Sequence, residues 1–434
     1  MAQDGTAGDV NVSGSQGVVA GTNNTQINNW PSRTTLTPAT LAALSPHTAV
    51  ARIRQLPHDD AVDLFASASV EVLTPKLRAL LMADEPKAVA ILADLDRSKA
   101  TELIDPIASD FDMLRPLPLA AEVVAQRAVE LRWDHEPGAG KLELAMPSSE
   151  GTWGYFRQYE QGRIIWRMGL GAVTFAVRGL IADVYLDSGG TGGELGFPRG
   201  EEYLLGSEPG AKGTWQRFEG GVIYSSSHGT YSLPTELEGA RRDWLGFPVA
   251  KAQMHDGVKS QRFEAGIIYS SEAGTFAVRS KVAECARGYV PTSAEEDIPS
   301  RRTGLVQRFR TLPSGVSVAY SSEDTGTHLV LGSWLDCYEE LGGPASWLGL
   351  PTARHEDRPD DRWVQKFEHG WIYDGVFDPA VAVRAETVEL AGERLGWPVS
   401  SEKTIDGSND ETIQYFENGA VILRDGKREV WQRS

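Results

Sequence analysis

The chain contains few cysteines, no long apolar stretch and no excess of basic residues. Only Cys285 and Cys337 occur among 434 residues, and neither belongs to a CxxC pair, so a disulfide scaffold and a cysteine-ligated zinc site are disfavoured. No apolar run approaches the roughly 18 residues that cross a bilayer. The formal net charge of −18 at pH 7 argues against nucleic acid as a partner, because binding phosphates requires a basic surface. These absences predict an acidic protein without a membrane span.

A recognisable export signal is also lacking at the start of the sequence. Residues 1–5 read MAQDG and are followed by neither a basic segment nor an apolar one. We therefore expect the protein in the cytoplasm, and export to the cell envelope without a recognisable signal is the alternative. A phosphate loop is excluded as well, because Gly138-Ala139-Gly140-Lys141 is followed by Leu142 where such a loop requires Ser or Thr.

Composition divides the chain into four segments. The sequence predicts a disordered tail at residues 1–34, an all-α helical-repeat domain at 35–133, a Gly-Pro-rich linker at 134–150 and a mainly β repeat domain at 151–434. With 41% hydrophobic residues, a chain of this length forms two or three separately cored domains rather than one.

The tail contains a stretch without charge. Residues 10–30 consist mostly of Gly, Asn, Ser, Thr, Gln and Val, a composition that forms no globular core by itself. Two interpretations are open: a flexible tail, or cross-β assembly in which Asn and Gln amides bond the identical amides of stacked chains. The residues expected in the core of such an assembly are Val18, Val19, Gly21, Asn24, Gln26, Ile27 and Asn28.

The spacing Asn24-x-Gln26-x-Asn28 beside a Gly-bounded β-branched run resembles the prokaryotic amyloid-signalling motifs related to the RIP homotypic interaction motif. The resemblance covers about twenty residues. It implies self-assembly through the tail and recruitment of an effector protein with a matching motif, in bacterial immune or cell-death signalling. Ala20 departs from the pattern, since a more β-prone residue is commoner at that position.

Residues 35–133 have apolar residues at i, i+3 and i+4, the periodicity of amphipathic helices. Three segments, 56–65, 83–92 and 95–104, share a plan in which an acidic residue caps or charges the first turn before an apolar face. Helices this short are stable only when they stack on neighbours. The plan resembles the helical repeats of magnesium-transporter N-domains and flagellar rotor proteins, which implies a small superhelix that serves as a spacer or docking surface.

The remainder of the chain repeats at intervals of about fifty residues, a period typical of propellers and solenoids. One repeated element is a hairpin, as in Phe218-Glu219-Gly220-Gly221-Val222-Ile223-Tyr224. The x-Gly pair is predicted to supply positive φ for a two-residue turn, and the alternating aromatic and β-branched residues to bury one face. Further copies lie at residues 159–166, 263–269, 367–373 and 416–422, and a sixth, at 309–320, carries an insertion.

The second repeated element is a four-residue turn that follows a helix-like stretch such as residues 236–244. Leu and the aromatic are expected to fill apolar surface, Gly to allow the turn and Pro to prevent continuation of the helix. The degenerate copy is Gly288-Tyr289-Val290-Pro291, and the regular ones are Leu195-Gly196-Phe197-Pro198, Leu245-Gly246-Phe247-Pro248, Leu348-Gly349-Leu350-Pro351 and Leu395-Gly396-Trp397-Pro398.

These residues resemble the LGFP repeat family, which is typical of actinobacteria, and the resemblance extends from about Thr152 to Ser434. It implies a compact, propeller-like ring of five or six repeats with short helices that binds a cell-wall glycan or polymer. We expect the strand near Glu429 to Gln432 to close the ring, because the half-units at the two ends would otherwise expose strand edges. The sequence leaves fivefold and sixfold pseudo-symmetry open.

Several recurring side chains allow a functional and a structural interpretation. Tryptophans at repeat positions could stack on carbohydrate, but residues at a fixed repeat position are more often core. The glutamate after each hairpin aromatic suggests paired carboxylates, yet its periodicity favours a structural role, either solvated or bonded to the turn. The histidines lack a catalytic or metal motif. These residues are Trp215, Trp244, Trp347, Trp363, Trp371 and Trp397; Glu219, Glu264, Glu368 and Glu417; and His228, His255, His328, His355 and His369.

Two functions from different classes remain open. In the first, the repeat ring recognises a ligand and the tail recruits an effector, which makes the protein a non-enzymatic signalling adaptor. In the second, the protein binds or anchors to the cell wall and its N-terminus is merely disordered. A hydrolase in the centre of the ring would need converging acids that the sequence does not show. We therefore predict no enzymatic activity, no metal and no cofactor.

Overall fold

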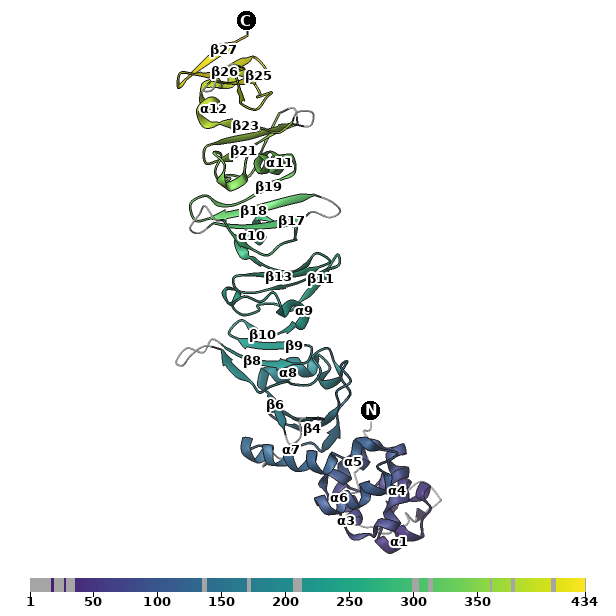
Figure 1. Ribbon diagram of the computed structural model, residues 1–434. Helices are drawn as coiled ribbons and strands as arrows, with labels where there is room; N and C mark the ends of the chain where they lie inside the picture. Colours follow the sequence, from purple (N-terminus) through teal and green to yellow (C-terminus); the bar gives the residue numbers. More distant parts are fainter. Residues whose placement is uncertain are drawn as a thin grey trace, which may run out of the picture. The chain divides into compact units, whose positions relative to one another are not determined.

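The structure is a computed structural model, in which the described residues are 17–18, 27–28, 36–134, 139–169, 173–205, 213–298, 304–310, 315–359, 361–375, 379–406 and 411–433. The chain forms two compact units (Figure 1). The helical unit comprises Met1–Asp134 and Gly140–Leu144, and the repeat unit comprises His135–Ala139 and Ala145–Ser434. Among the described residues, no helix is both long and apolar enough to traverse a bilayer.

The helical unit is built from short helices whose buried apolar side chains are mostly Leu, Ala, Val and Ile. The three predicted segments form α3, α5 and α6, and acidic N-caps hold two of them: the side chains of Asp84 and Asp96 accept bonds from Lys87 N and Lys99 N. α4 packs on α1, α2, α5 and α6. The elements are α1 (Pro38–Ala43), α2 (Pro46–Ile53), α3 (His58–Ser67), α4 (Val70–Ala83), α5 (Glu85–Asp94), α6 (Arg97–Ile104), η1 (Asp105–Ile107), η2 (Asp112–Leu114), α7 (Leu117–Leu131) and β3 (Leu142–Leu144).

Two short strands precede these helices. β1 (Gly17–Val18) pairs antiparallel with β2 (Ile27–Asn28), with Val18 opposite Ile27. Of the residues predicted to form an amyloid core, Val19, Gly21, Asn24 and Gln26 lie outside the described residues. The amyloid interpretation therefore stays a prediction.

The repeat unit contains six antiparallel sheets, numbered here in chain order. Their strands are β4 (Gly154–Tyr159), β5 (Gly162–Arg167) and β6 (Thr174–Arg178) in sheet 1; β7 (Tyr203–Leu205), β8 (Gly213–Phe218), β9 (Gly221–Ser226) and β10 (Gly229–Pro234) in sheet 2; β11 (Gln253–His255), β12 (Val258–Arg262), β13 (Gly266–Ser271) and β14 (Gly274–Arg279) in sheet 3; β15 (Val290–Pro291), β16 (Glu296–Asp297), β17 (Leu305–Arg310), β18 (Val316–Ser322) and β19 (Gly326–Leu331) in sheet 4; β20 (Glu356–Arg358), β21 (Arg362–Phe367), β22 (Gly370–Gly375) and β23 (Val381–Arg384) in sheet 5; and β24 (Lys403–Thr404), β25 (Thr412–Phe416), β26 (Gly419–Arg424) and β27 (Lys427–Gln432) in sheet 6.

A short helix follows each of the first five sheets. The helix-like stretch expected at residues 236–244 is shorter than predicted, because α9 covers only Thr235–Glu238 before the 3-10 turn η4 (Asp243–Leu245). The other connections contain α8 (Gly179–Asp187) and η3 (Gly190–Gly192), α10 (Ser280–Cys285), α11 (Gly332–Glu340) and η5 (Gly343–Ala345), and α12 (Ala385–Ala391) and η6 (Glu393–Leu395).

Each apolar core lies between two successive sheets. The core after sheet 2 joins Val222 and Leu233 of that sheet, Leu237 of α9, and Phe263 and Ile268 of sheet 3. Equivalent cores follow sheets 1, 3, 4 and 5. A sheet therefore contributes one face to the core before it and the other to the core after it, which is the nearest-neighbour packing of a repeat protein.

A buried glutamine links neighbouring sheets through the backbone. The side-chain amide of Gln261 donates to Ser232 O of sheet 2 at 2.8 Å and to Ala250 O of the loop before sheet 3 at 3.0 Å. The same two bonds are made by Gln216, Gln307, Gln365 and Gln414, all at most 2% exposed. Sheet 1 has Arg157 at this position.

No strand pairing among the described residues closes the repeats into a ring. β27, which contains the strand predicted near Glu429 to Gln432, pairs along its whole length with β26. In sheets 2 to 6, each described strand pairs only with strands of the same sheet. No closed barrel forms in the part of the chain that the structure describes. The antiparallel β repeats with short helices are confirmed, whereas the propeller-like ring is not.

Candidate functional site

The regular LGFP turns are part of the folding framework. Their glycines have φ between 65° and 76°, a left-handed conformation that favours glycine. The Leu residues are buried, as are the aromatics Phe197 and Phe247. The turn does not close its own unit but binds the next sheet, since Leu245 O and Phe247 O accept bonds from Ala265 N and Glu264 N of the following hairpin.

The recurring glutamate is the partner of this turn. Oε2 of Glu264 accepts a bond from Phe247 N at 2.9 Å, and Glu219, Glu368 and Glu417 accept the corresponding bonds at 2.7–3.0 Å. For Glu417, the bond from Trp397 N is the main cause of a pKa below the ordinary value. The structural interpretation of these glutamates thus agrees with their bonds to the turns.

The same contact explains why the turn needs glycine. A Cβ at Gly246 would lie 1.9 Å from Oε2 of Glu264, and Gly196, Gly349 and Gly396 are similarly crowded. In the fourth repeat, alignment on Pro291 places Tyr289 where the others have glycine, and Arg310 where they have glutamate. The glycine and the carboxylate are therefore lost together.

The glycine at the start of each returning strand has a different role from the one predicted. Phe218 pairs with Gly221, so the two turn residues are Glu219 and Gly220, and neither has a positive φ. Gly221 begins the returning strand with φ of 154° and lies against β10, where a Cβ would be 2.3 Å from Leu233 O. Backbone conformation and close approach to β10 therefore both favour glycine here.

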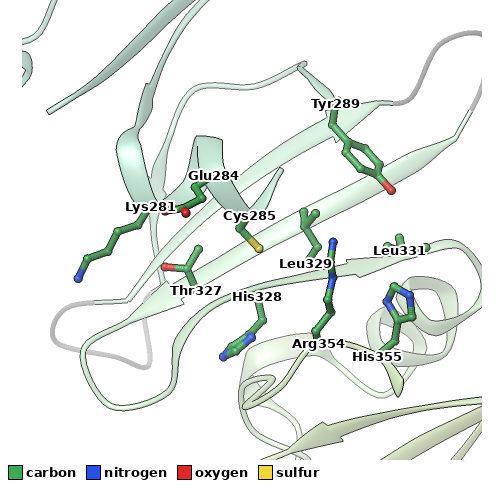
Figure 2. A pocket seen from close by; sticks show the side chains of 10 residues that line it. All are labelled: Lys281, Glu284, Cys285, Tyr289, Thr327, His328, Leu329, Leu331, Arg354 and His355. Carbon is green, nitrogen blue, oxygen red and sulfur yellow. The ribbon is translucent and has the colours of Figure 1, made fainter. Parts of the chain in front are cut away.

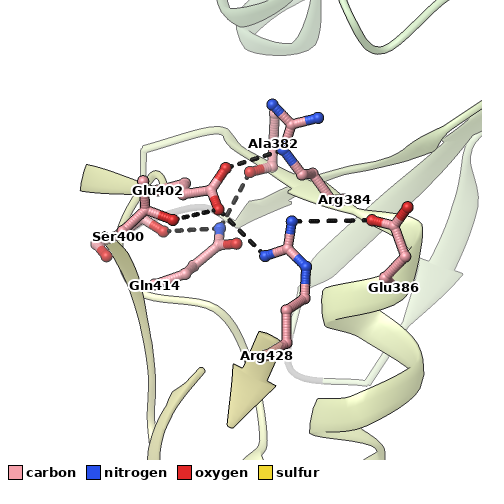
Figure 3. A network of polar contacts seen from close by, with 8 residues as sticks. Ala382, Arg384, Glu386, Ser400, Glu402, Gln414 and Arg428 are labelled. Atoms are coloured by element: carbon pink, nitrogen blue, oxygen red, sulfur yellow. Dashed lines mark hydrogen bonds and ion pairs between the residues drawn. The ribbon is translucent and has the colours of Figure 1, made fainter. Parts of the chain in front are cut away.

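Ion pairs connect successive sheets at alternate interfaces. The arginine that ends the last strand of a sheet pairs with the glutamate four residues after the next LGFP-type proline, in Arg178–Glu202, Arg279–Glu295 and Arg384–Glu402, at 2.8–2.9 Å. Figure 3 shows the last of these, in which Arg428 also donates to Glu402. Burial raises the pKa of Glu402, but bonds from Thr412, Arg384 and Arg428 outweigh it, and the net shift is downward.

Two interfaces lack this pair because both members are replaced. At the interface of sheets 2 and 3 the two positions are Pro234 and Ala252, and at that of sheets 4 and 5 they are Leu331 and His355. Ala252 packs on the core between sheets 2 and 3. Leu331 and His355 instead line a pocket of about 320 Å³.

This pocket combines charged and apolar side chains (Figure 2). Cys285 of α10 and Leu329 of β19 lie on its apolar side, and Arg354 extends between them and His355. Lys281 points away toward the rim. The full lining is Lys281, Glu284, Cys285, Tyr289, Thr327, His328, Leu329, Leu331, Arg354 and His355.

Burial shifts the pKa of two groups in the pocket toward their neutral forms. Burial, with Arg354 as the second cause, lowers the pKa of His355, whose ring stacks on Trp334 at 5.1 Å between centroids. Burial also raises the pKa of the Cys285 thiol. His328 Nε2 lies 2.7 Å from Thr325 O. Arg354 makes no hydrogen bond or ion pair with any described residue, so its charge is available.

The candidate tryptophans are all half-buried. Arg279 lies over the Trp244 ring and Arg384 over Trp347, at 4.4 and 4.3 Å, so these faces are occupied within the protein. Trp215 stacks on Tyr203, while Trp363 and Trp397 make edge contacts with Trp334 and Tyr373. Trp371 lies in β22.

The candidate histidines do not form one cluster. His328 and His355 share the pocket, His228 lies 3.1 Å from Glu264, and His255 and His369 are exposed. Sequence reasoning missed Arg354, Cys285 and Leu331 as pocket residues. The available signal was the replacement of the Arg–Glu pair by Leu331 and His355, which becomes visible only when the repeats are aligned on the LGFP proline.

Together, the fold and the contacts define a β-rich repeat protein built on LGFP-type turns. Residues 290–346 match the family model described as LGFP repeat. This segment includes the fourth sheet and α11, whose ends reach Leu331 and Glu340. No curated protein sequence matches the chain.

Solved structures give only weak similarities. The extracellular domain of a putative one-component system from B. thetaiotaomicron is 10% identical with a TM-score of 0.13, over 69% of this chain and 36% of that chain. PorZ, a surface component of the type-IX secretion system of Porphyromonas gingivalis, is 10% identical with a TM-score of 0.11, over 65% and 31%. AofleA from Arthrobotrys oligospora is 9% identical with a TM-score of 0.12, over 68% and 86%.

Proposed function

We propose that the repeat unit is a non-catalytic binding module and that the pocket along β19, lined by α10 on one side and by Arg354 and His355 of the loop before sheet 5 on the other, receives its ligand. The observation that carries the proposal is the open volume beside Leu331 and His355, the two residues that replace the Arg–Glu pair here. The regular contacts of the LGFP glycine, its glutamate and the bridging glutamine are kept in this repeat, by Gly349, Glu368 and Gln365. Polar and apolar side chains surround a volume of about 320 Å³, which suits one or two sugar residues.

The proposed ligand is a cell-wall glycan or polymer, and the supporting observation is the LGFP match over residues 290–346. Binding to such a polymer would place the protein in the cell envelope. The test is co-sedimentation of the full chain with purified, insoluble cell-wall material. The Leu331→Arg/His355→Glu double variant, which copies the ion pair of three other interfaces, should close the pocket and remain in the supernatant.

The control is Arg394→Gln, which removes an exposed charge outside the pocket. Sedimentation of this variant at the level of the unmodified protein is expected. A double variant that sediments as well as the unmodified protein would exclude the pocket as the wall-binding site. An unmodified protein that stays in the supernatant would exclude the wall polymer as ligand.

A second candidate function is that of a cytoplasmic adaptor whose tail recruits an effector. The supporting observation is the absence of charge across residues 10–30 together with the Asn24-x-Gln26-x-Asn28 spacing. A peptide of residues 10–30 should form thioflavin-positive fibrils, and Val19→Asp or Gln26→Lys should prevent them, because stacking would repeat the charge about every 4.7 Å. A peptide that stays monomeric for days would exclude the adaptor function, and wall binding would be the remaining candidate.

A further inference from the structure

We infer that the pocket along β19, between α10 and the loop before sheet 5, binds an anionic group, a carboxylate or a phosphate carried on a small sugar-like body, with Arg354 as its main ligand. The inference rests on the proposed function for the location of the site but specifies the charge of the ligand. It starts from the comparison of the five interfaces between sheets.

At three interfaces the arginine at this position already has a carboxylate partner. Arg178, Arg279 and Arg384 are each bound by a glutamate of the following repeat. At the interface of sheets 4 and 5 neither member is present, because Leu331 and His355 replace them. The site therefore has space but no internal carboxylate at the position where three interfaces have one, and unlike the interface of sheets 2 and 3, where Ala252 packs on the core, it leaves an open pocket.

Arg354 brings a positive charge into this space from the neighbouring position. It is exposed, it has no hydrogen-bonding or ion-pair partner among the described residues, and it extends into the pocket in Figure 2. A guanidinium offers parallel N–H donors that match the two oxygens of a carboxylate or phosphate. The chain as a whole has a net charge of −18 and repels anions. The guanidinium of Arg354 therefore provides a local attraction that the rest of the surface does not.

The remaining lining residues define the rest of the ligand. Lys281 and Glu284 are exposed and belong to the same helix, so their opposite charges offset each other at the rim. Leu329 and Leu331 provide apolar contact, while Tyr289 and His355 provide polar atoms with a ring face each. This combination suits a ring that carries both hydroxyl groups and one charged substituent.

The first measurement uses small soluble probes and the histidine side chains as reporters. The unmodified full chain is titrated with D-glucuronate, glucose 1-phosphate and D-glucose while the imidazole NMR signals of the eight histidines are recorded. His355→Gln and His328→Gln identify the two pocket signals. We expect both anions to shift these signals with saturation, and glucose to shift them little at the same concentrations.

The second measurement compares two variants that each lose one arginine charge. Arg354→Gln should weaken anion binding about tenfold or more, as expected for a charge-assisted hydrogen bond, whereas Arg394→Gln should bind as the unmodified protein does. Because Arg354 is exposed, the variant should keep its unfolding midpoint at neutral pH. A shift by only one of the two anions would assign the source of the charge to carboxylate or phosphate.

Three results would overturn the inference: equal shifts with glucose and the anions, no shift of the pocket signals with any probe, or unchanged anion affinity in Arg354→Gln. The outcome is separable from that of the co-sedimentation experiment. Wall binding without anion-dependent shifts would refute the charge specificity alone. Anion binding without wall binding would refute the polymer as ligand and leave the pocket chemistry intact.

Discussion

Each regular repeat places a carboxylate against a glycine that has no room for a side chain. In the third repeat, Glu264 accepts a bond from Phe247 N while its Oε2 occupies the space beside Gly246. The fourth repeat shows the alternative, since Tyr289 and Arg310 replace the two residues. Both the positive φ and the nearby carboxylate thus restrict Gly246 to glycine. Substitutions at Gly246 and Glu264 can separate these two effects.

Gly246→Ala should destabilise the repeat unit by about 2–4 kcal/mol, because φ of 75° is strained for alanine and its Cβ would collide with Glu264. Glu264→Ala alone should cost about 1.5–3 kcal/mol through the lost bond to Phe247 N. The double variant should be less destabilised than the sum, because the collision disappears. Denaturant unfolding of the four proteins measures this coupling, and strict additivity would show that the carboxylate does not restrict the glycine.

The environment of His355 leads to a pH prediction. Burial and then Arg354 lower its pKa, whereas Asp357 raises it. As pH falls from the ordinary histidine value of about 6.5, the unfolded state takes up the proton first, so this group reduces the stability of the folded state. Arg354→Gln removes one cause of the lowered pKa and should shrink this loss.

The measurement is an NMR titration of the His355 ring, combined with unfolding midpoints at neutral and mildly acidic pH. The pKa of His355 should move upward in Arg354→Gln and stay unchanged in Arg394→Gln. A pKa that is unaffected by Arg354→Gln would place the arginine outside electrostatic range of the imidazole, contrary to the structure.

At the scale of single elements, the buried glutamine is the polar link between sheets. Gln261 is 1% exposed, and its amide joins Ser232 O of one sheet to the loop of the next. Gln261→Leu removes both bonds and should lower the free energy of unfolding by about 1–3 kcal/mol. Gln253→Leu, on the exposed strand β11, is the matched control and should have little effect on the denaturant midpoint. Equal midpoints for the two variants would contradict the bridging role.

The sequence predicted the hairpins, the LGFP turns and the helices of the helical unit because local patterns determine them. Alternating residues define the strands, and φ limits the turn to glycine at Gly196, Gly246, Gly349 and Gly396. It did not predict the bridging glutamine, the use of Gly221 or the pocket. These features depend on which residues of different repeats meet, such as Leu331 and His355, and no local periodicity contains that information.

At the scale of the whole repeat unit, the cores define its cooperativity. Each core uses residues of two successive sheets, as Ile165 and Phe218 do after sheet 1 and Val383 and Phe416 do before sheet 6. Stability in such an array is a sum of unit and nearest-neighbour terms. A closed ring would add a stabilising interaction between the first and last sheets. A deletion at the C-terminus would then destabilise sheet 1 in a ring but not in an open array.

Deleting residues 428–434 therefore tests nearest-neighbour packing against ring closure. The deletion removes most of β27, including Val430, which packs on the core between sheets 5 and 6. Because β27 pairs only with β26 among the described residues, we expect faster amide exchange in sheet 6 and, to a smaller degree, in sheet 5.

Hydrogen exchange followed by mass spectrometry resolves these regions in the full chain. Deletion of residues 433–434 is the matched control, since it leaves β27 intact, and it should leave the exchange of sheet 5 unchanged. Exchange in sheet 1 should be the same in both deletions, because its partners in the nearest-neighbour arrangement are untouched. If the longer deletion instead accelerated exchange in sheet 1 as strongly as in sheet 5, the first and last sheets would be coupled and the ring predicted from the repeats would be correct.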